Sequence, residues 1–240
     1  MIVRFFIVLI AFILFAAPAK AQELSIDGII QKYAQALGGR EPWQQMHAVK
    51  LSGVLTTGGV DYPLTILNAK PNLCRLEILN EGKKVTMAYD GQAGWESNEA
   101  QSPEKKAIRD TRSKNFVEML AIFVDALIDY KAKDYQIKSL GQEKVDSDMA
   151  YKLEVTLAPG RTEFWYIDTK SFLPSKRSAV ITFREAQVVQ AIYYFDYKPV
   201  AGCMIPHYLE RTELHYLRGY EIRQAEINPE ISKADFAPIP

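Results

Sequence analysis

Three histidines, His47, His207 and His215, are the residues best suited to metal binding or acid–base chemistry. Within the stretch HYLERTELH, Glu213 and His215 lie two residues apart, so both would lie on one face of a predicted strand, with His207 further along it. A metal site would need a third ligand from another strand, and the sequence indicates none. We therefore expect polar side chains that face solvent rather than a metal site.

Short motifs that accompany catalysis or cofactor binding are missing from the sequence. It contains no His-Glu-x-x-His, Cys-x-x-Cys or Gly-x-Ser-x-Gly pattern and no glycine loop of the phosphate-binding type. Asp146 and Asp148 lie in VDSDMA, where turn formation explains both aspartates. We predict no catalytic residue, no metal and no cofactor; a hydrolase that depends on His207 or His215 is the enzymatic alternative.

The N-terminus has the pattern of a secretory signal peptide. Arg4 precedes the apolar run FFIVLIAFILFAA, which Pro18 and the small-x-small tripeptide Ala19-Lys20-Ala21 follow. The run is shorter than the roughly 20 residues that a membrane-spanning helix needs. We predict a signal peptide over residues 1–21, cleaved after Ala21, and export of the mature chain; an uncleaved anchor is the alternative.

Cys74 and Cys203 would then lie in an oxidising compartment, where a disulfide is permitted. Nothing in the sequence brings the two residues together, and Cys74 occupies the apolar face of a predicted strand. We expect two buried thiols, with a disulfide as the alternative.

Composition fits a globular protein with a real core, because 48% of the 240 residues are hydrophobic and 24% are charged. The formal net charge is zero, and a nucleic-acid-binding protein would be expected to be basic. We therefore predict no nucleic-acid partner.

Apolar alternation with a period of two, broken by Gly, Asn, Asp and Pro turns, predicts an antiparallel sheet over most of the chain. A helix should precede it, with Ser25 as N-cap, apolar residues at helical spacing to Leu37, and Gly38-Gly39 at its end. We expect one mainly β domain over residues 22–240, a single curved sheet of about ten strands that forms a half-open barrel. The predicted strands cover residues 47–57, 60–69, 73–79, 83–89, a short run through Trp95, 149–157, 161–168, 175–183, 187–197, 207–217 and 220–227.

One central helix is predicted over NFVEMLAIFVDALIDY, Asn115 to Tyr130, after a polar interruption from Gln101 to Lys114. Its apolar stripe is wide, and a barrel of this size has an interior that a plug, a lid or a ligand must fill. We expect this helix to cover the concave face of the sheet, either as permanent core or as a mobile lid over a cavity. The stripe comprises Phe116, Met119, Leu120, Phe123, Val124, Leu127 and Ile128.

Three stretches resemble the LolA/LolB-like family of periplasmic lipoprotein carriers. The first is AKPNLCRLEI followed by TMAYDGQAGWES, similar to the family's basic-Pro strand and its DG-x-x-x-W hairpin. The second is FWYIDTKSFLPSKRS, like the family's aromatic strand, turn and Leu-Pro corner. The third is YKPVAGCMIPHYLE with the terminal EINPEISKADFAPI, which resembles the tails of outer-membrane lipoprotein-sorting proteins.

The resemblance implies a periplasmic carrier, expected to be monomeric, that binds acyl chains of lipoproteins or lipids in a hydrophobic cavity. It also implies transfer from an inner-membrane donor towards an outer-membrane acceptor, and Lys70 occupies the family's transfer-related basic position, where Arg is more usual. A non-catalytic lipid-sensing or partner-binding module of the same fold is the alternative. The ligand-binding residues predicted for the cavity and its mouth are Met87, Tyr89, Trp95, Phe116, Met119, Leu120, Phe123, Leu127 and Trp165.

Overall fold

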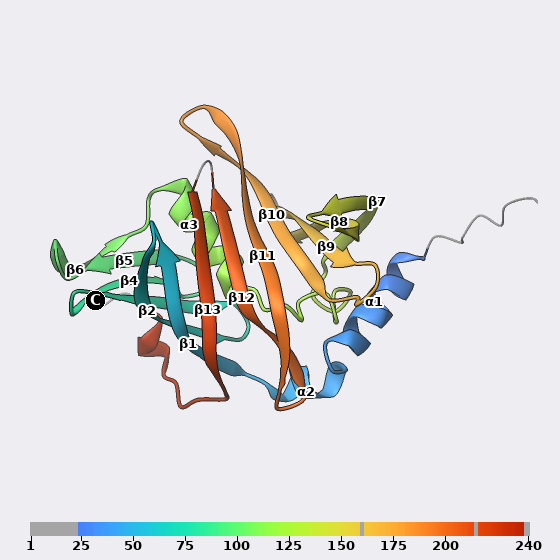
Figure 1. Ribbon diagram of the computed structural model, residues 1–240, viewed down its shortest axis with the longest axis horizontal. Helices are drawn as coiled ribbons and strands as arrows, with labels where there is room; N and C mark the ends of the chain where they lie inside the picture. Colours follow the sequence, from blue (N-terminus) through green and yellow to red (C-terminus); the bar gives the residue numbers. More distant parts are fainter. Residues whose placement is uncertain (1–23, 159–160, 214–215, 238–240) are drawn as a thin grey trace, which may run out of the picture.

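A single antiparallel sheet of thirteen strands makes up most of the molecule (Figure 1). The computed structural model describes residues 24–158, 161–213 and 216–237, so the predicted signal peptide lies outside the described residues. The sheet is curved and does not close, and its two edge strands are β6 (Ser102–Ala107) and β7 (Gln136–Val145). The predicted fold, a mainly β half-open barrel, is confirmed, although there are more strands than the expected ten or so.

Two meanders join to form this sheet. One runs from β1 to β6 and the other from β7 to β13, and the first and last strands of the chain pair with each other. The strands between the edges are β1 (Ala48–Thr57), β2 (Val60–Ala69), β3 (Leu73–Asn80), β4 (Lys83–Tyr89), β5 (Gly94–Asn98), β8 (Asp148–Ala158), β9 (Arg161–Asp168), β10 (Pro174–Phe183), β11 (Ala186–Val200), β12 (Cys203–Glu213) and β13 (Tyr216–Ile227).

The first helix, α1 (Ile26–Ala36), begins and ends as the sequence predicts. The Ser25 hydroxyl accepts a hydrogen bond from the Gly28 amide at 3.1 Å, and Gly38 follows the helix at a φ of 102°. A Cβ on Gly38 would lie 1.9 Å from the Gly202 carbonyl oxygen, so glycine is also needed there for close packing. A short helix that the sequence reading missed, α2 (Arg40–Gln45), comes next and buries Trp43.

The central helix differs from the prediction at both ends. It is α3 (Thr111–Ala121), capped by Asp110, whose carboxylate accepts from the Ser113 amide at 2.9 Å. Residues 122–134 continue as a series of turns that we call the plug segment. The helix ends early because side chains from the sheet bind its last carbonyl groups: Asn68 donates to the Leu120 oxygen at 2.7 Å and Arg177 to the Ile122 oxygen at 2.9 Å.

Helix α3 and the plug segment cover one face of the sheet, which we call the inner face. Helix α3 contacts strands of both meanders, β2 to β5 and β10, and it lies behind the strands in the view of Figure 1. The plug segment buries Val124, Ala126, Leu127 and Ile128 in the main hydrophobic core on this face. None of the described helices is long and apolar enough to cross a membrane.

The C-terminal segment packs against the other face of the sheet, the outer face. Phe236 is buried there against Ala48 and Ala69, just after the short 3-10 turn η1 (Lys233–Asp235). The Trp95 indole donates a hydrogen bond to the Phe236 carbonyl oxygen at 2.6 Å. This contact ties the end of the described chain to β5.

Two smaller predictions also have an outcome. Cys74 and Cys203 are both buried and free, so the disulfide alternative is wrong. Burial raises the pKa of Cys203 to about 11, with Asp125 adding to the shift and Lys70 opposing it, so this thiol stays protonated at neutral pH. Glu213 of β12 pairs with Tyr216 of β13, so β12 ends and β13 begins earlier than in the predicted strands 207–217 and 220–227.

Candidate functional site

A solvent-open pocket of about 710 Å³ lies where the plug segment meets the end of the curved sheet. We call it the outer pocket because it opens to solvent; it lies beside the plug segment, not on the outer face of the sheet. Its walls come from α2, the β2–β3 turn, the end of α3, the plug segment and the start of β9, so segments far apart in sequence form it together. Its lining includes Arg40, Trp43, Lys70, Tyr89, Glu118, Ile122, Phe123, Asp125, Asp129, Lys133, Tyr135, Leu157 and Arg161.

A second, apolar cavity of about 60 Å³ lies between the plug segment and the sheet, and most of the side chains that line it are buried. This inner cavity shares three of its lining residues, Trp43, Ile122 and Phe123, with the outer pocket. The partly buried Phe123 ring therefore borders both spaces. The other residues that line the inner cavity include Val49, Leu51, Ile66, Met119, Leu120, Val124, Ile205 and Leu209.

Charged groups surround the outer pocket. Lys70 donates a hydrogen bond to the Trp43 carbonyl oxygen and forms an ion pair with the buried carboxylate of Asp125 at 3.2 Å. Its ammonium lies 5.8 Å from the centre of the Phe123 ring. Lys133 donates to the Ala126 carbonyl oxygen at 3.0 Å. Positive charge therefore stands directly beside the apolar opening to the inner cavity.

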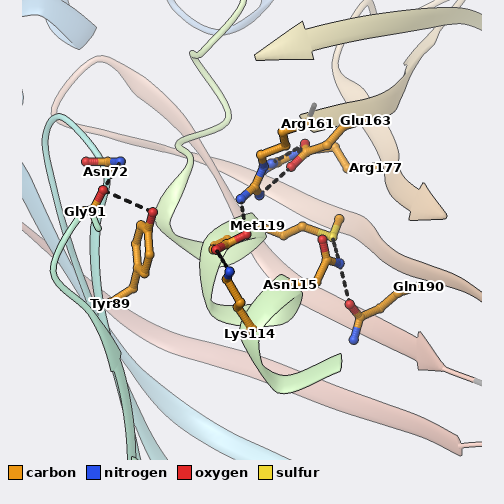
Figure 2. Close-up of polar contacts among 11 residues, drawn as sticks. Asn72, Tyr89, Gly91, Lys114, Asn115, Met119, Arg161, Glu163, Arg177 and Gln190 are labelled. Atoms are coloured by element: carbon orange, nitrogen blue, oxygen red, sulfur yellow. Dashed lines mark hydrogen bonds and ion pairs between the residues drawn. The ribbon is translucent and has the colours of Figure 1, made fainter. Parts of the chain in front are cut away.

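An ionic network begins at the pocket wall and continues into the core (Figure 2). Arg161 binds Glu118 of α3 and lies 2.9 Å from the carboxylate of Glu163. The other Glu163 oxygen is 2.7 Å from the Arg177 guanidinium, which also donates to the Ile122 carbonyl oxygen. The network thus joins α3 and the start of the plug segment to β9 and β10.

The electrostatic balance at Glu163 decides its charge. Burial alone would raise the pKa of this carboxyl, but the charges of Arg177 and Arg161 outweigh burial and leave the pKa below its ordinary value. Glu163 is therefore ionised at neutral pH despite being 1% exposed.

Further polar contacts anchor the rest of the plug segment. The hydroxyl of the buried Tyr33 donates to the Val124 carbonyl oxygen, and Arg40 forms an ion pair with Asp129. Burial raises the pKa of Tyr33 well above its ordinary value, so this donor keeps its proton. Tyr130 donates to Asp27 of α1 at 2.9 Å.

Five of the predicted ligand-binding and transfer residues gather around the two spaces. Tyr89, Lys70 and Phe123 line the outer pocket, while Met119, Leu120 and again Phe123 line the inner cavity. The Tyr89 hydroxyl donates to the Gly91 carbonyl oxygen at 3.1 Å, which fixes the ring at the pocket wall (Figure 2).

The remaining predicted residues lie elsewhere. Phe116, Leu127 and Trp165 are fully packed core residues, and the Arg177 guanidinium lies 4.3 Å from the centre of the Trp165 ring. Met87 packs on the inner face of β4 but lines neither space. Trp95, expected at the mouth, lies instead on the outer face beneath Phe236, because it pairs with Ala88 rather than with an inward-facing position of β4.

Several pocket residues escaped the sequence analysis, among them Arg40, Trp43, Lys133 and Arg161. A usable signal existed for Asp125, which with Glu118 is one of two acidic residues between Phe116 and Ile128 and is flanked on both sides by apolar residues of the stripe. A buried carboxylate needs a cation as partner, and the partly exposed Lys70 supplies it.

The histidine cluster has no metal-binding arrangement in the described part of the chain. His207 is buried rather than solvent-facing, and its Nδ1 lies 2.9 Å from the Ile205 carbonyl oxygen. His215 and the side chain of Glu213 lie outside the described residues. Among the described residues no group of three histidine, cysteine or acidic side chains could hold a metal ion.

Comparison with known proteins identifies the fold. No protein-family model matches the sequence, and no curated protein matches it significantly. Solved structures do match: a LolA superfamily protein from Nitrosomonas europaea has a TM-score of 0.55 at 14% sequence identity, covering 90% of this chain and 98% of its own. A DUF1329 family protein from Desulfovibrio piger has a TM-score of 0.59 at 11% identity, with 88% and 97% covered.

A candidate outer membrane lipoprotein-sorting protein domain from Vibrio parahaemolyticus matches at a TM-score of 0.55 and 13% identity, over 87% of this chain and 94% of that one. These structures share the open, curved sheet described above. The LolA-like fold that the sequence resemblance implied is therefore confirmed.

Proposed function

We propose that this protein is an exported, periplasmic carrier that binds the acyl chains of lipoproteins or lipids. The cargo's tail would pass Phe123 from the outer pocket into the inner cavity, and the plug segment would move to admit it. The observation that carries the proposal is that a solvent-open pocket and an apolar cavity share a wall made of Trp43, Ile122 and the partly buried Phe123. The fold shared with a LolA superfamily protein supports it.

The energetics favour such an exchange. Burying an acyl chain contributes about 0.8 kcal/mol for each methylene. The plug segment is held partly by polar contacts, such as those of Lys70 with Asp125 and of Arg177 with the Ile122 carbonyl, whose groups can be hydrated when the segment moves. It is also held by its buried apolar side chains Val124, Ala126, Leu127 and Ile128, whose places an acyl tail would take. An acyl tail of ordinary length can therefore offset the loss of these contacts.

The wider reaction cycle is part of the same proposal. A monomeric carrier would receive its cargo from an inner-membrane donor and release it to an outer-membrane acceptor. The outer pocket opens to solvent beside Lys70, so the cargo's polar part could remain accessible to such a partner.

The first test is to purify the mature protein from an envelope fraction without detergent and to analyse organic extracts by mass spectrometry. We expect acyl lipid or acylated peptide in stoichiometric amount. Uptake of a fluorescent fatty-acyl probe provides a second readout. A clean extract together with no probe uptake would contradict the proposal and favour a partner-binding module.

A variant links that binding to the site. Phe123→Glu places a charge between the two spaces, so we expect at least a tenfold loss of probe affinity while circular dichroism shows an unchanged sheet. The matched control is Phe195→Glu, because Phe195 is also partly buried but contacts the rings of Tyr193 and Tyr208 and lines neither space. Undiminished binding by Phe123→Glu would show that the tail does not pass this residue.

A further inference from the structure

We propose that the outer pocket selects amphiphiles with an anionic head group, a phosphate or a carboxylate, and that Lys133 together with Lys70 recognises it. The inference rests on the proposed function, since it concerns the head group of the ligand whose tail would enter the inner cavity. It adds a charge requirement that an apolar cavity by itself does not impose.

The first argument is the balance of charge around the pocket. Four cationic side chains line it, Arg40, Lys70, Lys133 and Arg161, against the three carboxylates of Glu118, Asp125 and Asp129. Arg40, Lys70 and Arg161 each form an ion pair with one of those carboxylates. Within the described part of the chain Lys133 forms no ion pair, so it supplies the surplus positive charge.

The second argument is the chemistry of Lys133. An ammonium group has three donors, and the hydrogen bond to the Ala126 carbonyl oxygen occupies one of them. The Lys133 side chain is exposed to solvent within the pocket, and the pocket walls partly enclose it. Burial lowers the pKa of Lys133, Asp125 opposes that shift, and the like charge of Lys70 adds to it. Lys70 and Lys133 thus lie near one shared carboxylate, and an anion between them would relieve their repulsion.

The third argument is position. Lys70 binds the Trp43 carbonyl oxygen and stands beside the Phe123 ring, and both of those residues border the inner cavity. A ligand whose tail lies past Phe123 would therefore place its head group at Lys70 and Lys133. The same walls carry Tyr89 and Leu157, which suit the apolar part of an amphiphile better than a free, fully hydrated anion.

The test is isothermal titration calorimetry on the detergent-free mature protein with three probes. The two amphiphiles are used below their critical micelle concentrations. Dodecyl phosphate is the anionic amphiphile, monolauroylglycerol is its neutral counterpart, and inorganic phosphate represents the free anion. We expect dodecyl phosphate to bind at least about fivefold more tightly than monolauroylglycerol, with a smaller difference at high salt. Inorganic phosphate should bind far more weakly than dodecyl phosphate, because it buries no tail.

Lys133→Gln should weaken dodecyl phosphate binding roughly fivefold and leave monolauroylglycerol unchanged, because it removes the charge and keeps a polar side chain of similar length. Lys138→Gln is the control, since Lys138 is an exposed lysine of β7 outside the pocket. Equal affinity for the two amphiphiles in both the wild type and Lys133→Gln would overturn the inference while leaving the proposed function standing. Absence of binding by either amphiphile would overturn both, and tight binding of inorganic phosphate alone would replace the amphiphile with a free anion.

Discussion

At the scale of single residues, the burial of Glu163 between two arginines shows how the plug segment is held to the sheet. Arg177 and Glu163 are both 1% exposed, and the guanidinium continues to the Ile122 carbonyl oxygen and to the Tyr194 hydroxyl at 3.3 Å. A buried pair of this kind gives little net stability compared with an apolar replacement, but losing one partner leaves the other charge uncompensated. The pair therefore fixes where α3 ends.

We expect Glu163→Gln to lower the free energy of unfolding by about 3–5 kcal/mol at pH 7, because Arg177 would remain buried without its counterion. Urea unfolding followed by circular dichroism measures the change. Glu143→Gln is the control: Glu143 lies 2.7 Å from Lys152 but is 46% exposed, so its loss should change stability by less than about 1 kcal/mol. Similar effects of the two substitutions would contradict the assigned role of Glu163.

The same carboxylate should make stability depend on pH. The pKa of Glu163 is lower in the folded protein than its ordinary value of 4.5, so the unfolded chain binds the proton more tightly. Its contribution is therefore fully present above about pH 4.5 and is lost as the pH falls through the folded-state pKa. The stability gap between the wild type and Glu163→Gln should accordingly narrow below pH 4.5, and a gap that stays constant down to pH 3 would contradict this origin.

At the scale of elements, the interior strands were predictable from the sequence and the edge strands were not. The strands Val60–Ala69 and Lys83–Tyr89 agree with the prediction at both ends, because turn residues bound them and one face of each is buried. Strands β6 and β7 pair on one side only and bury little, so SPEKKA and QIKSLGQEKV show no apolar alternation. Lysine and proline on such edges also discourage pairing with other chains.

The site was predictable to a lesser extent, for a related reason. Phe123 and Tyr89 belong to elements that the sequence predicts, whereas Lys133 belongs to the plug segment beyond the end of the predicted helix. Arg161 begins a predicted strand, but the sequence does not indicate that this strand lies beside α3. Helical spacing continues past Ala121 into the plug segment because Val124 and Leu127 are buried there too. Periodicity records burial, and it does not register that Asn68 and Arg177 bind the helix end.

The join between β1 and β13 is the point where the two meanders depend on each other, and Gly53 permits it. A Cβ on Gly53 would lie 1.8 Å from the Glu221 carbonyl oxygen, at the place where the pairing register shifts. We expect Gly53→Ala to lower the free energy of unfolding by about 1–3 kcal/mol through strain. The control Ser52→Ala, one residue earlier, should change it by less than about 0.5 kcal/mol. If thermal unfolding shows the same stability for Gly53→Ala and Ser52→Ala, then β1 and β13 accommodate a Cβ at position 53 without strain.

At the scale of the whole molecule, the described structure is the closed form of the proposed carrier. An inner cavity of about 60 Å³ is far smaller than the 300–1,000 Å³ typical of ligand pockets, so it cannot hold an acyl tail as it stands. The sheet cannot widen without breaking its ladders of hydrogen bonds. The plug segment has no regular secondary structure, and besides its buried apolar side chains it is held at backbone carbonyl groups and acidic side chains. The space for a tail must therefore come from the plug segment.

This reasoning predicts where a ligand changes the dynamics of the protein. In hydrogen exchange followed by mass spectrometry, binding of a dodecyl-chain probe should alter protection in residues 122–134 and leave β1, β2, β12 and β13 unchanged. These four strands serve as internal control, because each pairs on both sides and none depends on the plug segment for its ladder hydrogen bonds. A change spread over the strands would mean that the barrel itself opens. Bound probe without any change in residues 122–134 would mean that the tail lies on the surface of the outer pocket, and the plug segment would then be permanent core.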